Sequence, residues 1–117
     1  MVELERNEQD NTASLVCKIT DFGFAKAIDP QQKESMSLGT PLYMAPELAK
    51  NEEYGLQVDI WALGVITHNI MVGKPPFIGR DRLETFDKIC SSELDLTPFI
   101  KFKGNGANIK SFIQSCL

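Results

Sequence analysis

The residues with the clearest chemical potential follow a short apolar segment, in the stretch ITDFGFAK of residues 19–26. Asp21 offers a carboxylate, which is the hard oxygen ligand that Mg²⁺ prefers, at a point where a strand is expected to end beside a cleft. Phe22 can anchor the turn in apolar surroundings, and Gly23 permits backbone angles that other residues resist. The same tripeptide also fits an ordinary turn, so its meaning depends on the segments around it.

Two further segments hold a polar group in a rigid or helical frame. The first, GTPLYMAPE at residues 39–47, sets the Thr40 hydroxyl near the Tyr43 ring. The second, DIWALGVI at residues 59–66, places the Asp59 carboxylate in the first turn of an apolar helix. An unsatisfied buried charge is costly, so we expect Asp59 to be buried and to accept backbone N–H groups from a neighbouring loop.

The elements that would position these groups follow from the spacing of apolar residues. Residues 15–19 alternate in polarity, which predicts a short strand. Residues 24–42 show no sustained period and contain prolines and glycines, which predicts a long loop. Residues 58–72 are apolar on nearly every face, which predicts a helix inside a core, and Gly73 is placed to cap its end.

The second half of the chain predicts two more helices. Residues 82–90 have apolar side chains at helical spacing, and Asp81 with Glu84 has the spacing of a reciprocal N-terminal cap. Residues 94–106 are loop-like, and residues 108–117 form an amphipathic pattern. The expected apolar face of this last helix consists of Ile109, Phe112, Ile113 and Cys116.

Length and composition limit the classes of protein. The 117 residues, 43% of them hydrophobic, fit one globular domain, and the net charge of −4 argues against a nucleic-acid or anionic-membrane binder. Residues 1–14 are polar and charged and are expected to be a mobile lead-in before a domain at residues 15–117. The longest apolar run is shorter than the ~20 residues of a membrane span, and no secretory signal begins the chain. We therefore expect a soluble intracellular protein in the cytoplasm.

The cysteines and the single histidine indicate no metal site. Cys17, Cys90 and Cys116 form no CxxC pair and no metal-ligand spacing with His68. They are expected to be free thiols, with Cys90 and Cys116 on the apolar faces of helices. His68 lies within the apolar helix and is expected to be a packing residue rather than an acid or a base.

The three motifs, in this order and spacing, resemble the eukaryotic protein kinase family of the serine/threonine type over residues 15–117. The resemblance is to the C-terminal lobe of the catalytic domain, running from the DFG segment through the APE and DxWxxG segments. It implies a mostly α fold: a C-lobe fragment with a short β segment, a long activation loop and about three helices, with the N-lobe absent.

The resemblance also implies roles for the site residues. Asp21, with Phe22 and Gly23, would hold the Mg²⁺ that bridges the phosphates of ATP. Thr40 would contact the catalytic base, and residues 42–45 would form the floor that receives a protein substrate at its serine or threonine. Leu42 and Tyr43 are the floor residues that we expect to contact the substrate.

Further residues would have structural or regulatory roles. Glu47 would pair with a buried arginine, and Asp59 would tie its helix to the catalytic loop. Trp61 and Gly64 belong to the same structural motif. Residues 24–38 would be the activation loop, in which Ser37 and Ser35 are candidate phosphosites; the alternative is that neither is modified.

Several parts of such a kinase are missing from these residues. Residues 1–18 contain no glycine-rich loop, no phosphate-binding lysine and no His-Arg-Asp catalytic loop, and the arginine expected to pair with Glu47 would lie beyond Leu117. Both ends therefore look truncated, and we expect the chain alone to fold poorly, to bind ATP and Mg²⁺ weakly and to be inactive. Three interpretations stay open: part of a longer kinase, a binding module or decoy that associates with a complementary kinase portion or a chaperone, or a remnant without function. Residues 24–26 resemble calcium/calmodulin-dependent kinases.

Overall fold

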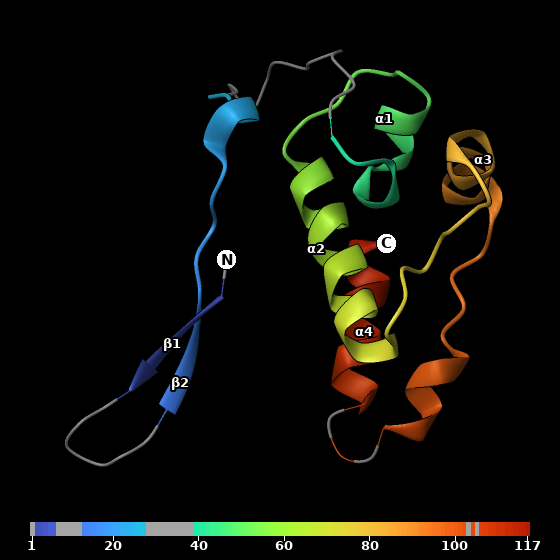
Figure 1. Ribbon diagram of the computed structural model, residues 1–117. Helices are drawn as coiled ribbons and strands as arrows, with labels where there is room; N and C mark the ends of the chain where they lie inside the picture. The colour runs from blue at the N-terminus through green and yellow to red at the C-terminus, as the bar shows by residue number, and fades with distance from the viewer. Residues whose placement is uncertain (1, 7–12, 28–38, 103, 105) are drawn as a thin grey trace.

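A computed structural model describes residues 2–6, 13–27, 39–102, 104 and 106–117 of the chain. Figure 1 shows a hairpin on one side and a helical body on the other, in which α2 is central and α4 crosses behind it. The strands are β1 (Val2–Arg6) and β2 (Ala13–Cys17), and the helices are α1 (Pro46–Ala49), α2 (Gln57–Val72), α3 (Arg82–Ser91) and α4 (Gly106–Cys116). Three short 3₁₀ turns complete the described elements: η1 (Phe22–Phe24), η2 (Pro41–Tyr43) and η3 (Thr97–Lys101).

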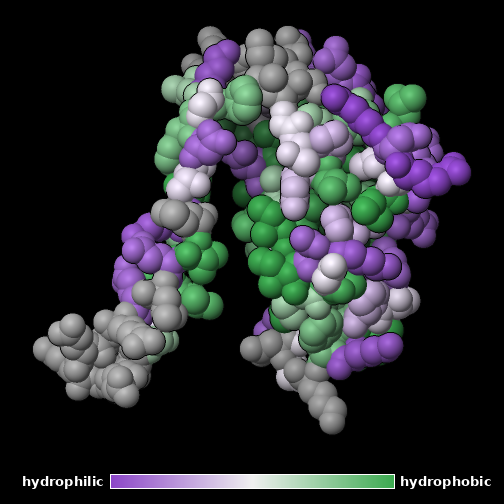
Figure 2. All heavy atoms as spheres, viewed as in Figure 1, coloured by the Kyte–Doolittle hydropathy of each residue, from purple (hydrophilic) through white to green (hydrophobic). Residues whose placement is uncertain are grey.

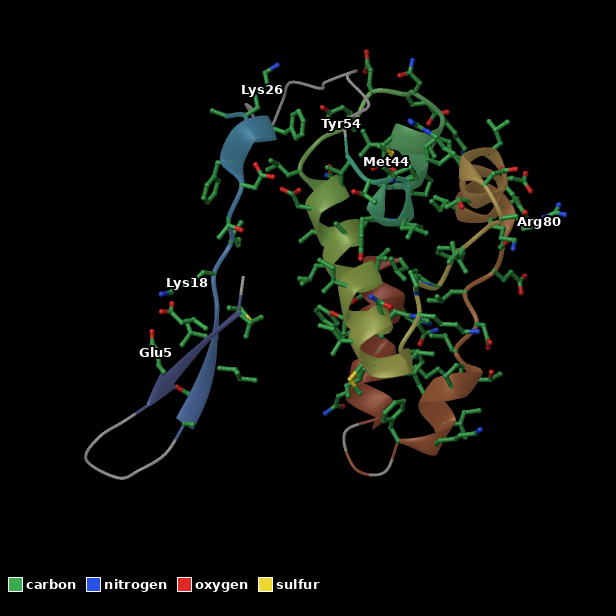
Figure 3. All side chains as sticks on the ribbon, viewed as in Figure 1. Glu5, Lys18, Lys26, Met44, Tyr54 and Arg80 are labelled. Atoms are coloured by element: carbon green, nitrogen blue, oxygen red, sulfur yellow. The ribbon has the colours of Figure 1, made fainter. Side chains whose placement is uncertain are left out.

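The hairpin is antiparallel, with Val2 opposite Cys17 and Arg6 opposite Ala13. The segment expected to be a mobile lead-in, residues 1–14, contains the strand β1, whose sequence VELE also alternates apolar and polar residues. Lys18 forms an exposed ion pair with Glu3, which adds little stability because both groups remain in water. Figure 3 shows Lys18 and Glu5 on the side of the hairpin that is turned away from the helical body.

The predicted helix boundaries agree closely with the structure. Gly73 ends α2 with φ 84°, and its N–H donates to the Asn69 carbonyl at 2.8 Å, as a glycine cap should. The Asp81 carboxylate caps α3 by accepting the Glu84 N–H at 2.8 Å. The reciprocal bond is shifted by one residue, because the Glu84 carboxylate accepts the N–H of Arg80 at 2.9 Å rather than that of Asp81.

The core forms where α2, α4 and η2 meet. Val65 and Ile113 are fully buried between α2 and α4. Gly64 allows this close approach, because a Cβ atom at that position would lie 2.6 Å from the Cys116 Cβ. Figure 3 shows Met44 pointing into the body between α1 and α2. The other buried apolar residues are Ala45, Leu48, Phe77, Ile89 and Phe99.

The expectation that α2 lies inside a core holds for only one face of the helix, which carries the buried Gly64, Val65 and His68. Ile60, Leu63, Ile66 and Ile70 are exposed along one face of α2, with Ile70 reaching 75% exposure. Figure 2 shows this face of the helical body as hydrophobic and turned toward the hairpin. Periodicity predicted the apolar character correctly, but within the described residues no element covers this face.

His68 is a packing residue, as expected. Its ring is buried, its Nδ1 lies 2.9 Å from the Lys74 carbonyl, and its edge meets the Phe99 ring at a centroid distance of 5.4 Å. These contacts hold η3 against α2. The expected loop at residues 94–106 therefore contains an ordered turn, which Pro98 at its first positions favours.

Smaller differences concern individual side chains. Phe112, expected on the buried face of α4, is exposed, and so is Cys90 on α3. The cysteines are free thiols, as expected. The described residues include no helix with the length and apolar character that crossing a bilayer requires.

Candidate functional site

The backbone at Asp21 takes a left-handed conformation, with φ 64° and ψ 67°. Aspartate adopts this conformation more often than most residues other than glycine, because its short polar side chain can hydrogen-bond locally. The η1 turn follows and closes with a bond from the Ala25 N–H to the Phe22 carbonyl at 3.0 Å. A Cβ atom on Gly23 would lie 3.4 Å from Asp21 Oδ1, so the carboxylate lies directly against this glycine. The result is an exposed carboxylate at the end of the hairpin.

The expectation that Phe22 anchors this turn in apolar surroundings is wrong. Its side chain is 68% exposed, and Phe24 is exposed to a similar degree. An aromatic ring anchors a turn only when other apolar groups cover it. Within the described residues these two rings have no such cover.

The second motif forms a compact platform around η2. Gly39 has φ 118°, which favours glycine, and it leads into Thr40, whose carbonyl accepts the Tyr43 N–H at 3.1 Å. Met44 and Ala45, directly after the turn, are almost fully buried. These two residues anchor the platform in the core, while Thr40 stays exposed.

Leu42 and Tyr43 are half-buried on this platform. They are presented by a turn that is closed by the bonds from the Tyr43 N–H to the Thr40 carbonyl and from the Met44 N–H to the Pro41 carbonyl, and that is anchored by the buried Met44. The platform therefore offers a hydroxyl, an aliphatic side chain and an aromatic side chain in one rigid segment.

Glu47 lies in the first turn of α1, where a negative charge suits the helix dipole. Its backbone carbonyl accepts the Glu52 N–H at 2.8 Å, across a turn in which Asn51 has φ 58°. The Glu47 side chain is half-buried. This residue therefore lies where the platform joins the loop before α2.

The Asp59 carboxylate is exposed in the first turn of α2, so the expectation of a buried, hydrogen-bonded charge is wrong. Trp61, two residues later, stacks on Phe77 with a centroid distance of 5.9 Å. Its indole Nε1 is buried and has no hydrogen-bond partner among the described residues. Gly64 serves the helix packing described above.

The predicted site residues fall into two groups. Asp21, Phe22 and Gly23 lie at the end of the hairpin, whereas the platform belongs to the helical body. Ser35 and Ser37, with most of the expected activation loop, lie outside the described residues. In the parts of the chain that the structure describes, no cluster of three or more histidine, cysteine or acidic side chains could hold a metal ion.

Sequence reasoning missed a charged network at the start of α3. Arg80 Nε donates to Glu84 Oε2 at 2.8 Å, and Lys88 Nζ lies 3.3 Å from Glu84 Oε1. The hydrogen bonds from Arg80, and then that from Lys88, lower the pKa of Glu84 to about 2. The i, i+4 spacing of the three residues was the signal that could have revealed the network.

A buried threonine fixes the loop before α3. The Thr85 hydroxyl donates to the Asp81 carbonyl at 2.7 Å and accepts the Gly79 N–H at 3.0 Å. A Cβ atom on Gly79 would lie 2.5 Å from the Thr85 backbone nitrogen, so only glycine fits there. The loop and the helix therefore form one rigid unit.

Comparison with known proteins gives the class of protein to which the three motifs belong. The profile of the protein kinase domain matches residues 4–117, and its match begins within the segment expected to precede the domain. The chain belongs to the eukaryotic protein kinase family of the serine/threonine type.

The relatives are protein kinases, and two of the three described here are named as serine/threonine kinases. The chain is 38% identical over 102 residues to serine/threonine-protein kinase CLA4 of Saccharomyces cerevisiae, covering 86% of this chain and 12% of that protein. It is 40% identical over 111 residues to serine/threonine-protein kinase shk2 of Schizosaccharomyces pombe, covering 92% and 18%. It is 35% identical over 116 residues to calcium/calmodulin-dependent protein kinase cmkB of Emericella nidulans, covering 97% and 28%. The chain thus spans between about a tenth and a third of the length of these relatives.

Proposed function

We propose that these residues form the C-terminal-lobe part of a kinase catalytic domain that transfers the γ-phosphate of ATP to serine or threonine in proteins. One observation carries the proposal most directly. An exposed aspartate is fixed in a left-handed turn, and a rigid platform with an exposed hydroxyl follows it in sequence. The membership of the family supports the same reaction.

The donor set at Asp21 fits one way of binding Mg²⁺. This ion keeps several of its waters and binds through one or two carboxylates together with substrate phosphates, rather than in a cage of protein ligands. A single exposed carboxylate, with no acidic cluster around it among the described residues, matches that mode. When bound, the ion would neutralise charge on the transferring phosphates. Asp21 would hold it, and Gly23 would keep space open beside the carboxylate.

The platform would position the protein substrate. Thr40 would contact the catalytic base, and Leu42 and Tyr43 would contact the peptide beside the accepting hydroxyl. Their rigid backbone supports this role, because holding reactants in the correct geometry provides much of the acceleration in phosphoryl transfer.

The 117 residues alone would be inactive. Their sequence contains no glycine-rich loop, no lysine of a Val-Ala-Ile-Lys segment and no His-Arg-Asp catalytic loop. Phosphoryl transfer depends on charge stabilisation by those groups, and Asp21 cannot replace them. Purified chain with Mg²⁺ and ATP should show no turnover above background. Turnover that disappears in Asp21→Asn would contradict this expectation.

A chimeric kinase tests the positive part of the proposal. Residues 15–117 would replace the matching segment of the Saccharomyces cerevisiae kinase CLA4, and phosphorylation of a protein substrate would be measured with ³²P-labelled ATP. The chimera should be active, and Asp21→Asn should lower its turnover by roughly 10²–10³-fold because a transition-state charge contact is lost.

The control is Asp87→Asn, which removes an exposed carboxylate on α3 and should change turnover less than about twofold. A chimera whose turnover is equally unaffected by both substitutions would refute the role of Asp21. Loss of activity in both variants alike would show that the effect is not specific to Asp21.

A second function, that of a non-catalytic binding module, is favoured by the exposed apolar face of α2. Exposed apolar surface of this kind marks an interaction site. The chain would then associate with a complementary kinase portion or a chaperone. Native mass spectrometry of the chain from its source would separate the two functions: a larger kinase polypeptide supports the first, and a 13.1 kDa chain held in a complex supports the second.

A further inference from the structure

The η3 turn connects two helices of the body through one buried aromatic ring. Phe99 is 3% exposed, and the centroid of its ring lies 5.4 Å from that of His68 on α2 and 5.9 Å from that of Phe102. A Cβ atom on Gly106, at the start of α4, would lie 3.2 Å from the Phe99 carbonyl oxygen. Figure 1 shows η3 in orange, at the end of the body far from α1 and the platform. At that end, α2 and the start of α4 are therefore connected through Phe99.

The backbone hydrogen bonds that close η3 are long. The Phe99 N–H donates to the Leu96 carbonyl at 3.2 Å, and the Phe102 N–H donates to the Phe99 carbonyl at 3.3 Å. The bonds of a 3₁₀ turn have poorer geometry than those of an α-helix, which is why such turns are short. The turn therefore has little stability of its own and relies on the side-chain bonds at its start.

These side-chain bonds join Thr97 to Asp95. The Thr97 hydroxyl donates to Asp95 Oδ1 at 2.7 Å, and the Thr97 N–H donates to the same oxygen at 2.9 Å. The two bonds, that of the hydroxyl first, lower the pKa of Asp95 below its ordinary value, so the carboxylate is charged at neutral pH. The start of η3 therefore depends on a hydroxyl hydrogen that lies against a negative charge.

The Thr97 hydroxyl is accessible to a modifying enzyme. Thr97 is exposed and lines two surface hollows, of about 430 and 390 Å³, which lie on either side of it. Pro98 follows it, and a proline directly after the acceptor, with no N–H to satisfy, is the feature that proline-directed protein kinases select. The sequence contains one other such pair, Thr40-Pro41 in the platform. Thr97 therefore has the exposure and the neighbour that such a kinase requires.

The charges around Thr97 oppose a phosphate at this position. The first hollow is lined by two carboxylates, Glu93 and Asp95, and by Lys110. The second contains Lys101. Asp95 already touches the Thr97 hydroxyl, whereas a lysine that moved to a phosphate would form an exposed ion pair, which adds little stability. Repulsion from the carboxylate in direct contact is therefore the larger effect.

We propose that Thr97 is a phosphorylation site for a proline-directed protein kinase, and that a phosphate on Thr97 opens η3. The Thr97 oxygen attacks the γ-phosphorus of ATP bound to that kinase, the bond from this phosphorus to the β–γ bridging oxygen breaks, and ADP leaves. The hydroxyl proton passes to a base of the modifying kinase. Phosphothreonine has no hydroxyl hydrogen to donate to Asp95, and it sets a second negative charge against that carboxylate. The turn then opens, and Phe99 separates from His68.

The proposal goes beyond the proposed function, because Thr97 is here the substrate of a different kinase. Its test uses the chimeric kinase described above with Asp21→Asn added, so that the activity of the chimera itself contributes little label. The protein is incubated with a purified proline-directed kinase and ³²P-labelled ATP, and the labelled residues are located by mass spectrometry. Thr97 should carry label. Pro98→Ala should lower that label about tenfold or more, and Ser92→Ala, which removes a nearby exposed hydroxyl, should change it less than twofold.

Hydrogen exchange followed by mass spectrometry tests the effect of the phosphate on η3. Phosphorylation should raise the exchange rate of the peptide that spans residues 97–102 about fivefold or more, and that of α3 less than twofold. Asp95→Asn keeps an oxygen that can accept both bonds from Thr97 but removes the charge. The phosphate should therefore accelerate exchange less in this variant than in the parent.

Three results would overturn the proposal: no phosphate on Thr97, equal labelling of Thr97 in Pro98→Ala, or exchange over residues 97–102 that phosphorylation leaves unchanged. None of these measurements requires phosphoryl transfer by the chimera. Failure of the Thr97 site is therefore distinguishable from failure of the kinase assignment.

Discussion

At the scale of single residues, the structure separates side chains by what holds them. Asp21 is exposed but its backbone is fixed, so its position depends on a turn rather than on packing. His68 is the reverse case: its polar ring is buried, its Nδ1 lies 2.9 Å from the Lys74 carbonyl, and the ring packs against Phe99. Of the two, only Asp21 has the exposure that a ligand-binding group requires.

The Glu84 carboxylate provides a residue-scale prediction about acid. Its pKa is lowered to about 2 in the folded chain, below its ordinary value of 4.5, first by the Arg80 side chain. A lowered folded-state pKa stabilises the folded form above the ordinary value, and this contribution is lost as the pH falls from about 4.5 toward about 2. Protection of the α3 amides against hydrogen exchange, corrected for intrinsic rates, should therefore fall over this range.

In Glu84→Gln, which has no carboxylate to protonate at this position, the fall in protection of the α3 amides that is due to Glu84 should be missing. Asp87→Asn is the control, because Asp87 is an exposed carboxylate on the same helix. If the protection of α3 in Glu84→Gln fell as steeply with acid as in the parent chain, the Glu84 network would not be its source.

At the scale of elements, the closest contact is between α2 and the end of α4. Gly64→Val should destabilise the helical body by about 1–3 kcal/mol, because the added side chain meets Cys116 and Leu117 in a packed core. The measurement is urea unfolding, followed by circular dichroism at 222 nm, of the chimeric kinase described above, in which the rest of the catalytic domain is present. Gly55→Ala is the control, since its new Cβ would meet mainly the movable end of the Gln57 side chain.

If Gly64→Val and Gly55→Ala shifted the urea midpoint equally, the close packing of α2 on α4 would not limit stability.

A second element-scale test is Thr85→Val, which removes both hydrogen bonds of a buried hydroxyl. It should cost about 1–3 kcal/mol because the Gly79 N–H loses its partner, and Thr85→Ser should recover most of the loss.

The sequence predicted the longer helices of the fold well. Gly73 and Asp81 marked the end of α2 and the start of α3, since both act through bonds to residues three or four positions away. It predicted β1 and η3 poorly, because a charged strand and a five-residue turn have weak local signals. For the site, it predicted the motifs but not the exposure of Phe22 and Asp59, which depends on which elements cover them.

At the scale of the whole molecule, the feature that matters most for stability is the exposed apolar face of α2. Four large aliphatic side chains there are roughly half-exposed or more, and full burial of each is worth ~1.5–3 kcal/mol. The forgone stabilisation is ~3–6 kcal/mol, comparable with the ~5–15 kcal/mol stability of an ordinary domain. We therefore expect the isolated chain to unfold without a sharp transition, to bind the dye ANS and to self-associate.

Substitutions on that face test this expectation. Ile60→Lys with Ile70→Lys should reduce ANS fluorescence and shift the chain toward monomer in light scattering, with little loss of helical signal, because both residues are exposed. Val65→Lys, at a fully buried position of the same helix, should instead abolish the helical signal. A parent chain that is monomeric, dye-free and cooperative in thermal unfolding would disprove the expectation.

The hairpin has a consequence beyond its role in presenting Asp21. Within residues 2–6 and 13–17, β1 and β2 pair only with each other, so each strand leaves one row of peptide groups unmatched along its outer side. Such rows are templates for further strands, and the charges of Glu3 and Lys18 are of the kind that discourages their stacking. Neutralising that pair should let molecules join edge to edge into thioflavin-positive fibrils.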